Sequence, residues 1–214
     1  MSLRLSIDER GSALLVALLL AALMGAVAAA LVTLATTETL IGASYRHAQE
    51  VSIGAEAALE RALHDLGVIP DWSLVLSAPP ANLTSGFDDG ASTPRGPDGR
   101  PLDLARLTAD RQQESDARDG PGVFGADSPQ WRLFAHAAPR ALLSAPGFDV
   151  PLYFVVWVAD DESDGDGNAS VDSNQRLLVR ATAFGAGGAR RSVEARIRRA
   201  GPGELRLDGW RQIR

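Results

Sequence analysis

The residues best suited to chemistry lie in an acidic segment, ADDESDGDGNASVDSNQ, at residues 159–175. A loop kinked by Gly165 and Gly167 can turn alternate side chains toward one centre, and Ca²⁺ binds six to eight oxygen atoms of carboxylates, amides and carbonyls. Six acidic residues crowd into 13 positions of this segment, and a cation would relieve their mutual repulsion. The predicted Ca²⁺ ligands stand at every second position: Asp160, Glu162, Asp164, Asp166 and Asn168, with Asp172 and Asn174 next.

The segment does not complete the calcium loop of an EF-hand. That loop needs a bidentate Glu at its twelfth position, where a frame from Glu162 places Ser173 and a frame from Asp160 places Val171. A calcium loop of another kind is therefore one interpretation. The alternative is a polar hairpin loop whose charges are solvated.

No catalytic group of residues accompanies this segment. His47, His64 and His136 have no zinc spacing, and the chain lacks a G-x-S-x-G motif and a glycine-rich phosphate loop. The absence of cysteine excludes thiol catalysis. The sequence predicts a protein that is not an enzyme and requires no cofactor. Its net charge of -6 gives no electrostatic reason to expect a nucleic-acid partner.

A long uncharged run precedes everything else. From Gly11 to Thr37 the chain carries no charged residue and is mostly Ala, Leu and Val, which exceeds the 20 or so apolar residues that span a bilayer. Arg4 and Arg10 lie before the run, and this bias places the N-terminus in the cytoplasm and the rest of the chain outside. An alternative is a secretion signal that is removed after "AVAAA", near Ala30.

The helical pattern continues beyond the apolar run. No proline interrupts residues 12–66, and after Glu38 the apolar residues fall on one helical face: Val51, Ala55, Ala58, Leu59, Ala62 and Leu66. We therefore expect one helix with an all-apolar half at 12–37 and an amphipathic half at 38–66. The second half must pack on other structure.

The remaining chain divides into two parts. Residues 67–126 are rich in Pro, Gly, Asp and Ser and predict a loop-rich region, with one short helix around 102–113. Residues 127–214 contain strand patterns with short connections, which predict an antiparallel sheet of about four strands with one solvated face. A helix packed on this sheet gives an α+β fold.

The N-terminal third resembles the type IV pilins, and most closely the PilX-like minor pilins. The resemblance depends on RG-S before the apolar run, on Thr36-Thr37 after it, and on "AEAAL" at residues 55–59. It implies a pilin-like fold and a leader, residues 1–11, that prepilin peptidase removes after Gly11. Ser12 would then be the N-methylated first residue. The implied partners are other major and minor pilins, which contact the N-terminal helix first in the inner membrane and then in the pilus.

One position departs from the family pattern. Major pilins usually carry Glu at the fifth mature position. In this chain, which resembles them, that position is Val16. The absence fits a rare subunit that primes or caps pilus assembly and contributes to adhesion. The large minor pseudopilin of type II secretion resembles this chain in the same absence and is an alternative. A second alternative is a single-pass membrane protein whose periplasmic domain binds calcium or another ligand.

Overall fold

The computed structural model describes residues 9–77, 85, 89–91, 93–120, 122–139, 150–201 and 203–213, with side chains from residue 12 onward. Its chain divides into two compact units, Met1–Arg46 and His47–Arg214. The first helix, α1, runs from Glu9 to Val68 without a break through 60 residues. It ends where Pro70 follows, because proline cannot continue a helix.

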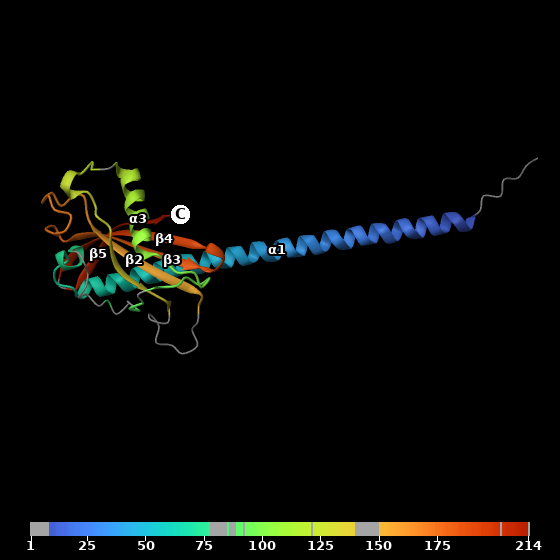
Figure 1. The fold of residues 1–214 in the computed structure, drawn as a ribbon, viewed down its shortest axis with the longest axis horizontal. Coiled ribbons are helices and arrows are strands. Elements are labelled where there is room, and N and C mark those ends of the chain that lie inside the picture. The colour runs from blue at the N-terminus through green and yellow to red at the C-terminus, as the bar shows by residue number, and fades with distance from the viewer. Residues whose placement is uncertain are drawn as a thin grey trace, which may run out of the picture. The chain divides into compact units, whose positions relative to one another are not determined.

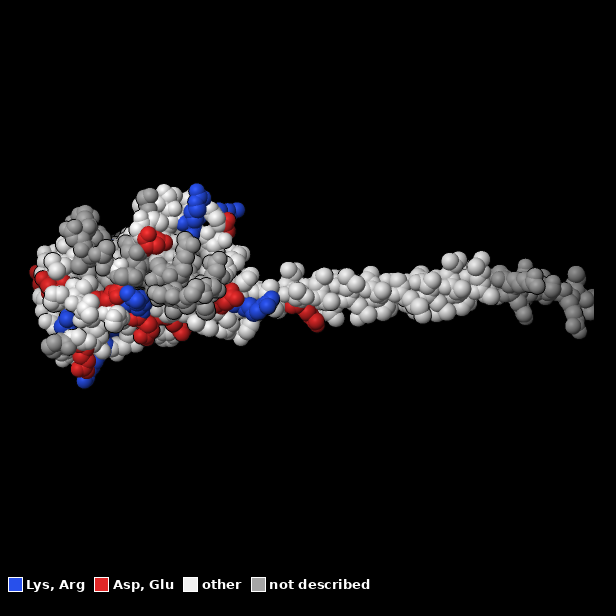
Figure 2. Space-filling view, turned by 90° about the horizontal axis from the view of Figure 1, so that it is seen from below, with Lys and Arg blue, Asp and Glu red and all other residues white. Residues whose placement is uncertain are grey.

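The first unit consists of the apolar part of α1. Its large apolar side chains are exposed, including Leu19 at 66% and Met24 at 71%. Figure 2 shows no acidic or basic atoms along residues 12–37, and the first red atoms belong to the part of the helix that begins at Glu38. By length and composition this helix can cross a membrane.

The second unit contains one antiparallel sheet of five strands rather than the expected four or so. Its strands lie in sequence order: β1 Arg132–Ala137, β2 Leu152–Asp160, β3 Arg176–Gly185, β4 Arg190–Gly201 and β5 Glu204–Ile213. The C-terminal strand, β5, pairs with β4 along its length. Its apolar pattern changes phase because Leu207 pairs with Ile197 and Gly209 pairs with Arg196, which leaves Asp208 as a bulge.

Helices cover both faces of this sheet (Figure 1). The second half of α1 and the short helix α2 (Ser73–Leu76) pack on one face, where Leu66 and Trp72 join Phe154 and Val179 in the main core. On the opposite face, α3 (Leu104–Asp119) and its N-terminal flank contact a second core that contains Trp131 and Trp157. The prediction that one face of the sheet is solvated is therefore wrong, because α3 covers that face.

The described part of the region between α1 and the sheet contains helical elements as well as loops. Asp103 caps α3 by accepting a hydrogen bond from the backbone N–H of Arg106 at 2.9 Å. A single 3-10 turn, η1 (Gly125–Asp127), follows before β1. These elements carry Leu104 and Leu107 onto the second face of the sheet, so this region contributes to the fold.

Gly54 allows α1 to lie close to the sheet. A Cβ atom at this position would come within 2.9 Å of Leu152 Cδ1 and of Phe154 Cε1, which is shorter than van der Waals contact. We expect Gly54→Ala to lower the free energy of unfolding by about 1 to 3 kcal/mol, because overpacking outweighs the gain in helix propensity. Urea denaturation of the detergent-solubilised chain, followed by tryptophan fluorescence, measures this change.

Gly67 provides the matched control for that substitution. It also lies in α1, but a Cβ atom there would approach nothing closer than 3.8 Å. Gly67→Ala is therefore expected to leave stability unchanged or to raise it by a few tenths of a kcal/mol near the helix end. Equal losses in the two variants would contradict the close packing of α1 at Gly54.

Candidate functional site

The residues implied in processing lie at the start of α1. Gly11 and Ser12 are both helical, while residues 1–8 of the predicted leader lie outside the described residues. Val16 lies one turn further along and is 54% exposed. Among the described residues of the first unit, none covers this surface, since the most apolar window of the helix is 0% buried.

The acidic segment forms the connection from β2 to β3. Asp160 is the last residue of β2, and β3 begins at Arg176. Gly165 and Gly167 adopt φ angles of 70° and 77°, a region that glycine enters without strain, and so the loop can turn sharply there. One carboxylate oxygen from each of Asp160, Asp164 and Asp166 lies within 4.8 Å of the others. Three of the five predicted ligands are thus together.

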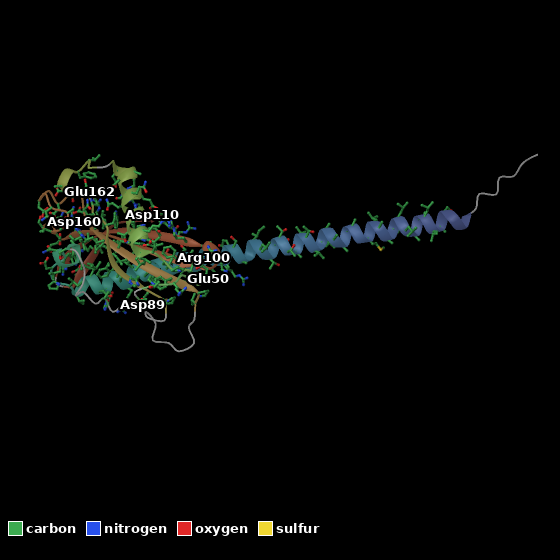
Figure 3. All side chains as sticks on the ribbon, viewed as in Figure 1. Glu50, Asp89, Arg100, Asp110, Asp160 and Glu162 are labelled. Carbon is green, nitrogen blue, oxygen red and sulfur yellow. The ribbon has the colours of Figure 1, made fainter. Side chains whose placement is uncertain are left out.

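The other two predicted ligands have different partners. Glu162 is bound to Arg196 of β4. The Asn168 side-chain oxygen accepts a hydrogen bond from the backbone N–H of Ser170 at 3.1 Å. Figure 3 shows Asp160 and Glu162 at one end of the second unit, whereas Glu50 lies at the other end.

The next two candidates, Asp172 and Asn174, also bond within the loop. An Asp172 oxygen accepts from the backbone N–H of Arg176 at 3.2 Å, and Asn174 donates to Asp161 at 2.7 Å. The carboxylate of Asp172 is not a member of the group formed by Asp160, Asp164 and Asp166.

Two neighbouring carboxylates, Asp160 and Asp161, are both 0% exposed but differ in their partners. The oxygens of Asp161 accept hydrogen bonds from Asn174 Nδ2 and from the Ser163 hydroxyl. Asp160 Oδ1 accepts one hydrogen bond, from the backbone N–H of Asp161 at 3.0 Å. Asp160 Oδ2 has no hydrogen-bond partner among the described residues.

Burial and like charge act together on this carboxyl. Burial, followed by the negative charge of Asp164, raises the pKa of Asp160 to about 8. Burial also raises the pKa of Asp172. In both groups the surroundings disfavour the charged form, as expected where acidic side chains lack a nearby cation.

The loop is held against two other elements. The backbone N–H of Gly167 donates to Asp127 of η1 at 2.6 Å, and that of Ala169 donates to the carbonyl of Ala126 at 3.3 Å. The backbone N–H of Asp172 donates to the hydroxyl of Ser73 in α2 at 3.2 Å. The loop is therefore hydrogen-bonded to η1 and to α2 at the same time.

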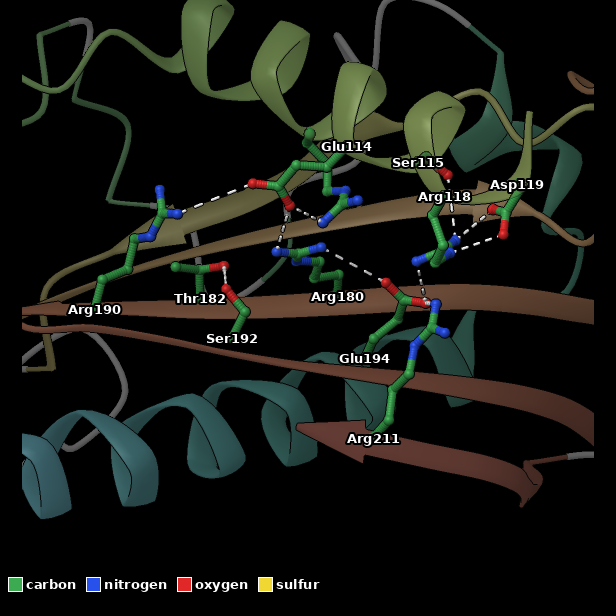
Figure 4. A network of polar contacts seen from close by, with 11 residues as sticks. Glu114, Ser115, Arg118, Asp119, Arg180, Thr182, Arg190, Ser192, Glu194 and Arg211 are labelled. Carbon is green, nitrogen blue, oxygen red and sulfur yellow. Dashed lines mark hydrogen bonds and ion pairs between the residues drawn. The ribbon is translucent and has the colours of Figure 1, made fainter. Parts of the chain in front are cut away.

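A second polar cluster lies between α3 and the sheet (Figure 4). Arg180 of β3 and Glu194 of β4 are each 4% exposed. Glu114 of α3 accepts a hydrogen bond from Arg180 at 3.0 Å, while Arg118 and Arg211 lie against Glu194. The prediction of one solvated face does not include this cluster, because alternation along β4 places Glu194 on the face that was expected to be solvated. The sequence of β2 contains the signal for a covered second face. Its residues are apolar on both faces of the strand, which indicates that both faces of the sheet are buried there.

A cavity of about 330 Å³ lies beside this cluster, and Phe124 and Trp210 form part of its wall. The charged side chains that line it are paired with one another: Arg118 with Asp119, Arg196 with Glu162, and Arg211 with Glu194. The lining of this cavity is therefore aromatic in part, and each charged side chain named here already has a partner of opposite charge.

We compared the chain with models of known protein families, with curated proteins and with solved structures, and none of the three comparisons gave a match. The arrangement itself, a long apolar N-terminal helix packed on an antiparallel sheet, is compatible with a pilin-like fold.

Proposed function

We propose that this chain is a membrane-inserted, pilin-like structural subunit that other subunits bind through the apolar half of α1. The observation that carries this proposal is the contrast within one continuous helix. From residue 12 to residue 37 its large side chains are exposed and uncharged, whereas Val51, Ala55, Leu59 and Leu66 of the second unit are buried in the main core. The exposed half needs an apolar environment that the chain itself does not supply.

Lipid and neighbouring helices are the two environments that meet this need. A bare apolar helix of this length is strongly unfavourable in water, because each large side chain gains about 1.5 to 3 kcal/mol on burial. The run is also rich in alanine, and small residues let helices approach one another closely within a membrane. Membrane insertion followed by helix packing in a filament would use the same surface twice.

The resemblance to PilX-like minor pilins supports a finer version of the proposal. Prepilin peptidase would cut after Gly11, and Ser12 would become the first residue of the mature subunit. The chain would then move from the inner membrane, with its N-terminus in the cytoplasm, into a pilus built from major and minor pilins. Val16 cannot neutralise the terminal amine of a neighbour, which favours a low-abundance subunit that primes or caps the fibre and contributes to adhesion.

Two alternatives follow from the same features. The large minor pseudopilin of type II secretion would share the missing carboxylate at Val16. A permanently anchored protein with a periplasmic domain that binds calcium would keep its leader, and the group of Asp160, Asp164 and Asp166 favours a cation-binding domain.

N-terminal mass spectrometry of the protein isolated from its native cell separates these classes. The filament proposal predicts a first residue of Ser12, with the added mass of one methyl group. An intact leader would favour the permanent anchor, and a start near Ala30 would indicate a removed secretion signal. Either of these results would contradict the proposal.

A further inference from the structure

The end of β2 contains a buried carboxylate oxygen that the fold leaves without a partner. Asp160 is 0% exposed, and its Oδ2 atom has no hydrogen bond among the residues that the structure describes. Buried polar atoms in native proteins are nearly always paired, and an unpaired charged oxygen is especially unfavourable. Asp161 shows that the same region can satisfy an equally buried carboxylate, since both of its oxygens accept hydrogen bonds from side chains.

The surroundings of Asp160 are acidic rather than basic. Oxygens of Asp164 and Asp166 lie within 4.8 Å of an Asp160 oxygen and of each other. In the described part of the chain, no Arg or His forms an ion pair with any of these three residues, and Arg196 pairs instead with Glu162 and Asp161. Three carboxylates therefore converge without a protein cation to balance them.

We propose that Asp160, Asp164 and Asp166 bind a Ca²⁺ ion between the end of β2 and the loop that follows it. The donor set is entirely oxygen, which suits a hard cation, and no His is part of the group. Three carboxylates supply between three and six oxygens according to whether each binds through one atom or two, and water completes the six to eight that Ca²⁺ takes.

The existing hydrogen bonds leave these carboxylates free to bind the ion. Asp164 accepts from the backbone N–H of Ser173 at 2.7 Å and from its hydroxyl, and Asp166 accepts from the backbone N–H of Asn168 at 2.8 Å. Each carboxylate oxygen has a second lone pair, so these contacts would orient the ligands rather than compete with the ion.

The ion would fasten the loop to the sheet. Asp160 belongs to β2, whereas Asp164 and Asp166 belong to the loop that also contacts η1 and α2. A chain without cysteine has no disulfide to perform this task. This inference does not depend on the filament proposal, since it concerns only the second unit.

The test is Ca²⁺ binding by the full chain in detergent, measured by equilibrium dialysis and by thermal unfolding after chelation. At a free Ca²⁺ concentration of 100 times the Kd, the melting temperature is expected to rise by about 5 to 10 °C. Mg²⁺ at the same concentration is expected to give a smaller rise, because it requires a tighter octahedral site.

Three variants locate the site. Asp166→Ala should abolish the rise without disturbing the fold, because Asp166 is exposed. Asp160→Asn has the same shape without the charge, and it should remove the response while leaving the calcium-free melting temperature equal or higher. Glu162→Gln should keep the full response, since Glu162 is bound to Arg196.

Three results would overturn the proposal. One is no bound Ca²⁺ in dialysis. Another is an equal or larger rise with Mg²⁺. The third is a response that survives Asp166→Ala and Asp160→Asn but is lost in Glu162→Gln.

Discussion

Replacing Leu20 and Leu23 together by arginine is expected to keep the chain out of the membrane. Both leucines lie near the centre of the uncharged run and are exposed, Leu20 at 51% and Leu23 at 61%. Each Leu→Arg change at a helix centre makes insertion less favourable by about 3 to 4 kcal/mol, so the pair totals roughly 6 to 8 kcal/mol. The eight leucines and three valines between Ser12 and Thr37 contribute about 3 to 7 kcal/mol in favour of insertion on the same scale.

Carbonate extraction of membranes measures this effect as the fraction of the chain that stays in the pellet. The wild-type chain should remain there almost completely, and the Arg pair should leave it. The Leu20→Ala/Leu23→Ala pair shortens the same side chains without adding charge, and it should remain in the pellet. An Arg pair that stays as firmly bound as the wild type would show that residues 12–37 do not cross the bilayer.

Glu194→Gln is expected to lower the free energy of unfolding by about 3 to 5 kcal/mol. Glu194 is 4% exposed, and three arginines surround it: Arg118 at 3.6 Å, Arg180 at 3.8 Å and Arg211 in direct contact (Figure 4). Removing one charge from a buried ionic group leaves the opposite charges uncompensated, and this is much more destabilising than the loss of one hydrogen bond. Chemical denaturation of the detergent-solubilised chain measures the loss.

Glu204→Gln is the matched control for the buried cluster. Glu204 also pairs with an arginine, Arg206, but both side chains are exposed, at 59% and 60%. Exposed ion pairs contribute about 0 to 1 kcal/mol, so this variant should be nearly as stable as the wild type. If both variants lost the same stability, the cluster beneath α3 would not be a buried ionic network.

The long helix and the strands could be predicted from the sequence because their signals are local. Absence of proline and an unbroken apolar run are sufficient for α1, and alternation with β-branched residues indicates the strands. The bulge at Asp208 changes the phase of β5, so its apolar positions do not alternate as a simple strand requires. The sheet has five strands, whereas the sequence predicts about four.

The covered second face of the sheet depends on contacts between distant segments. A helix with few apolar residues, α3, packs through Leu104 and Leu107 onto Trp157, and nothing in the α3 sequence alone shows which surface it covers. The buried partners Arg180 and Glu194 follow from that packing. Alternation along β4 alone places Glu194 on the face that was expected to be solvated, although the continuous apolar run of β2 indicates a strand buried on both sides.

In the acidic loop, too, the sequence predicts which residues lie near one another locally but not which tertiary contacts they make. Spacing by two correctly groups Asp160, Asp164 and Asp166, because the glycine turns bring alternate side chains together. Spacing does not show that Arg196 of β4 reaches Glu162, or that the side-chain oxygen of Asn168 accepts a hydrogen bond from the backbone N–H of Ser170. Both contacts arise from tertiary packing or turn geometry, which a pattern of residue types does not contain.

The central claim is that the apolar half of α1 is shared with other subunits in a filament. Its most direct test is quantitative mass spectrometry of surface filaments sheared from the native cell, compared with a strain that lacks prepilin peptidase. The proposal predicts that the chain is present in the filaments at a small fraction of the major subunit and is absent from them without the peptidase. A chain that is found only in the inner membrane, at the same level in both strains, would contradict it.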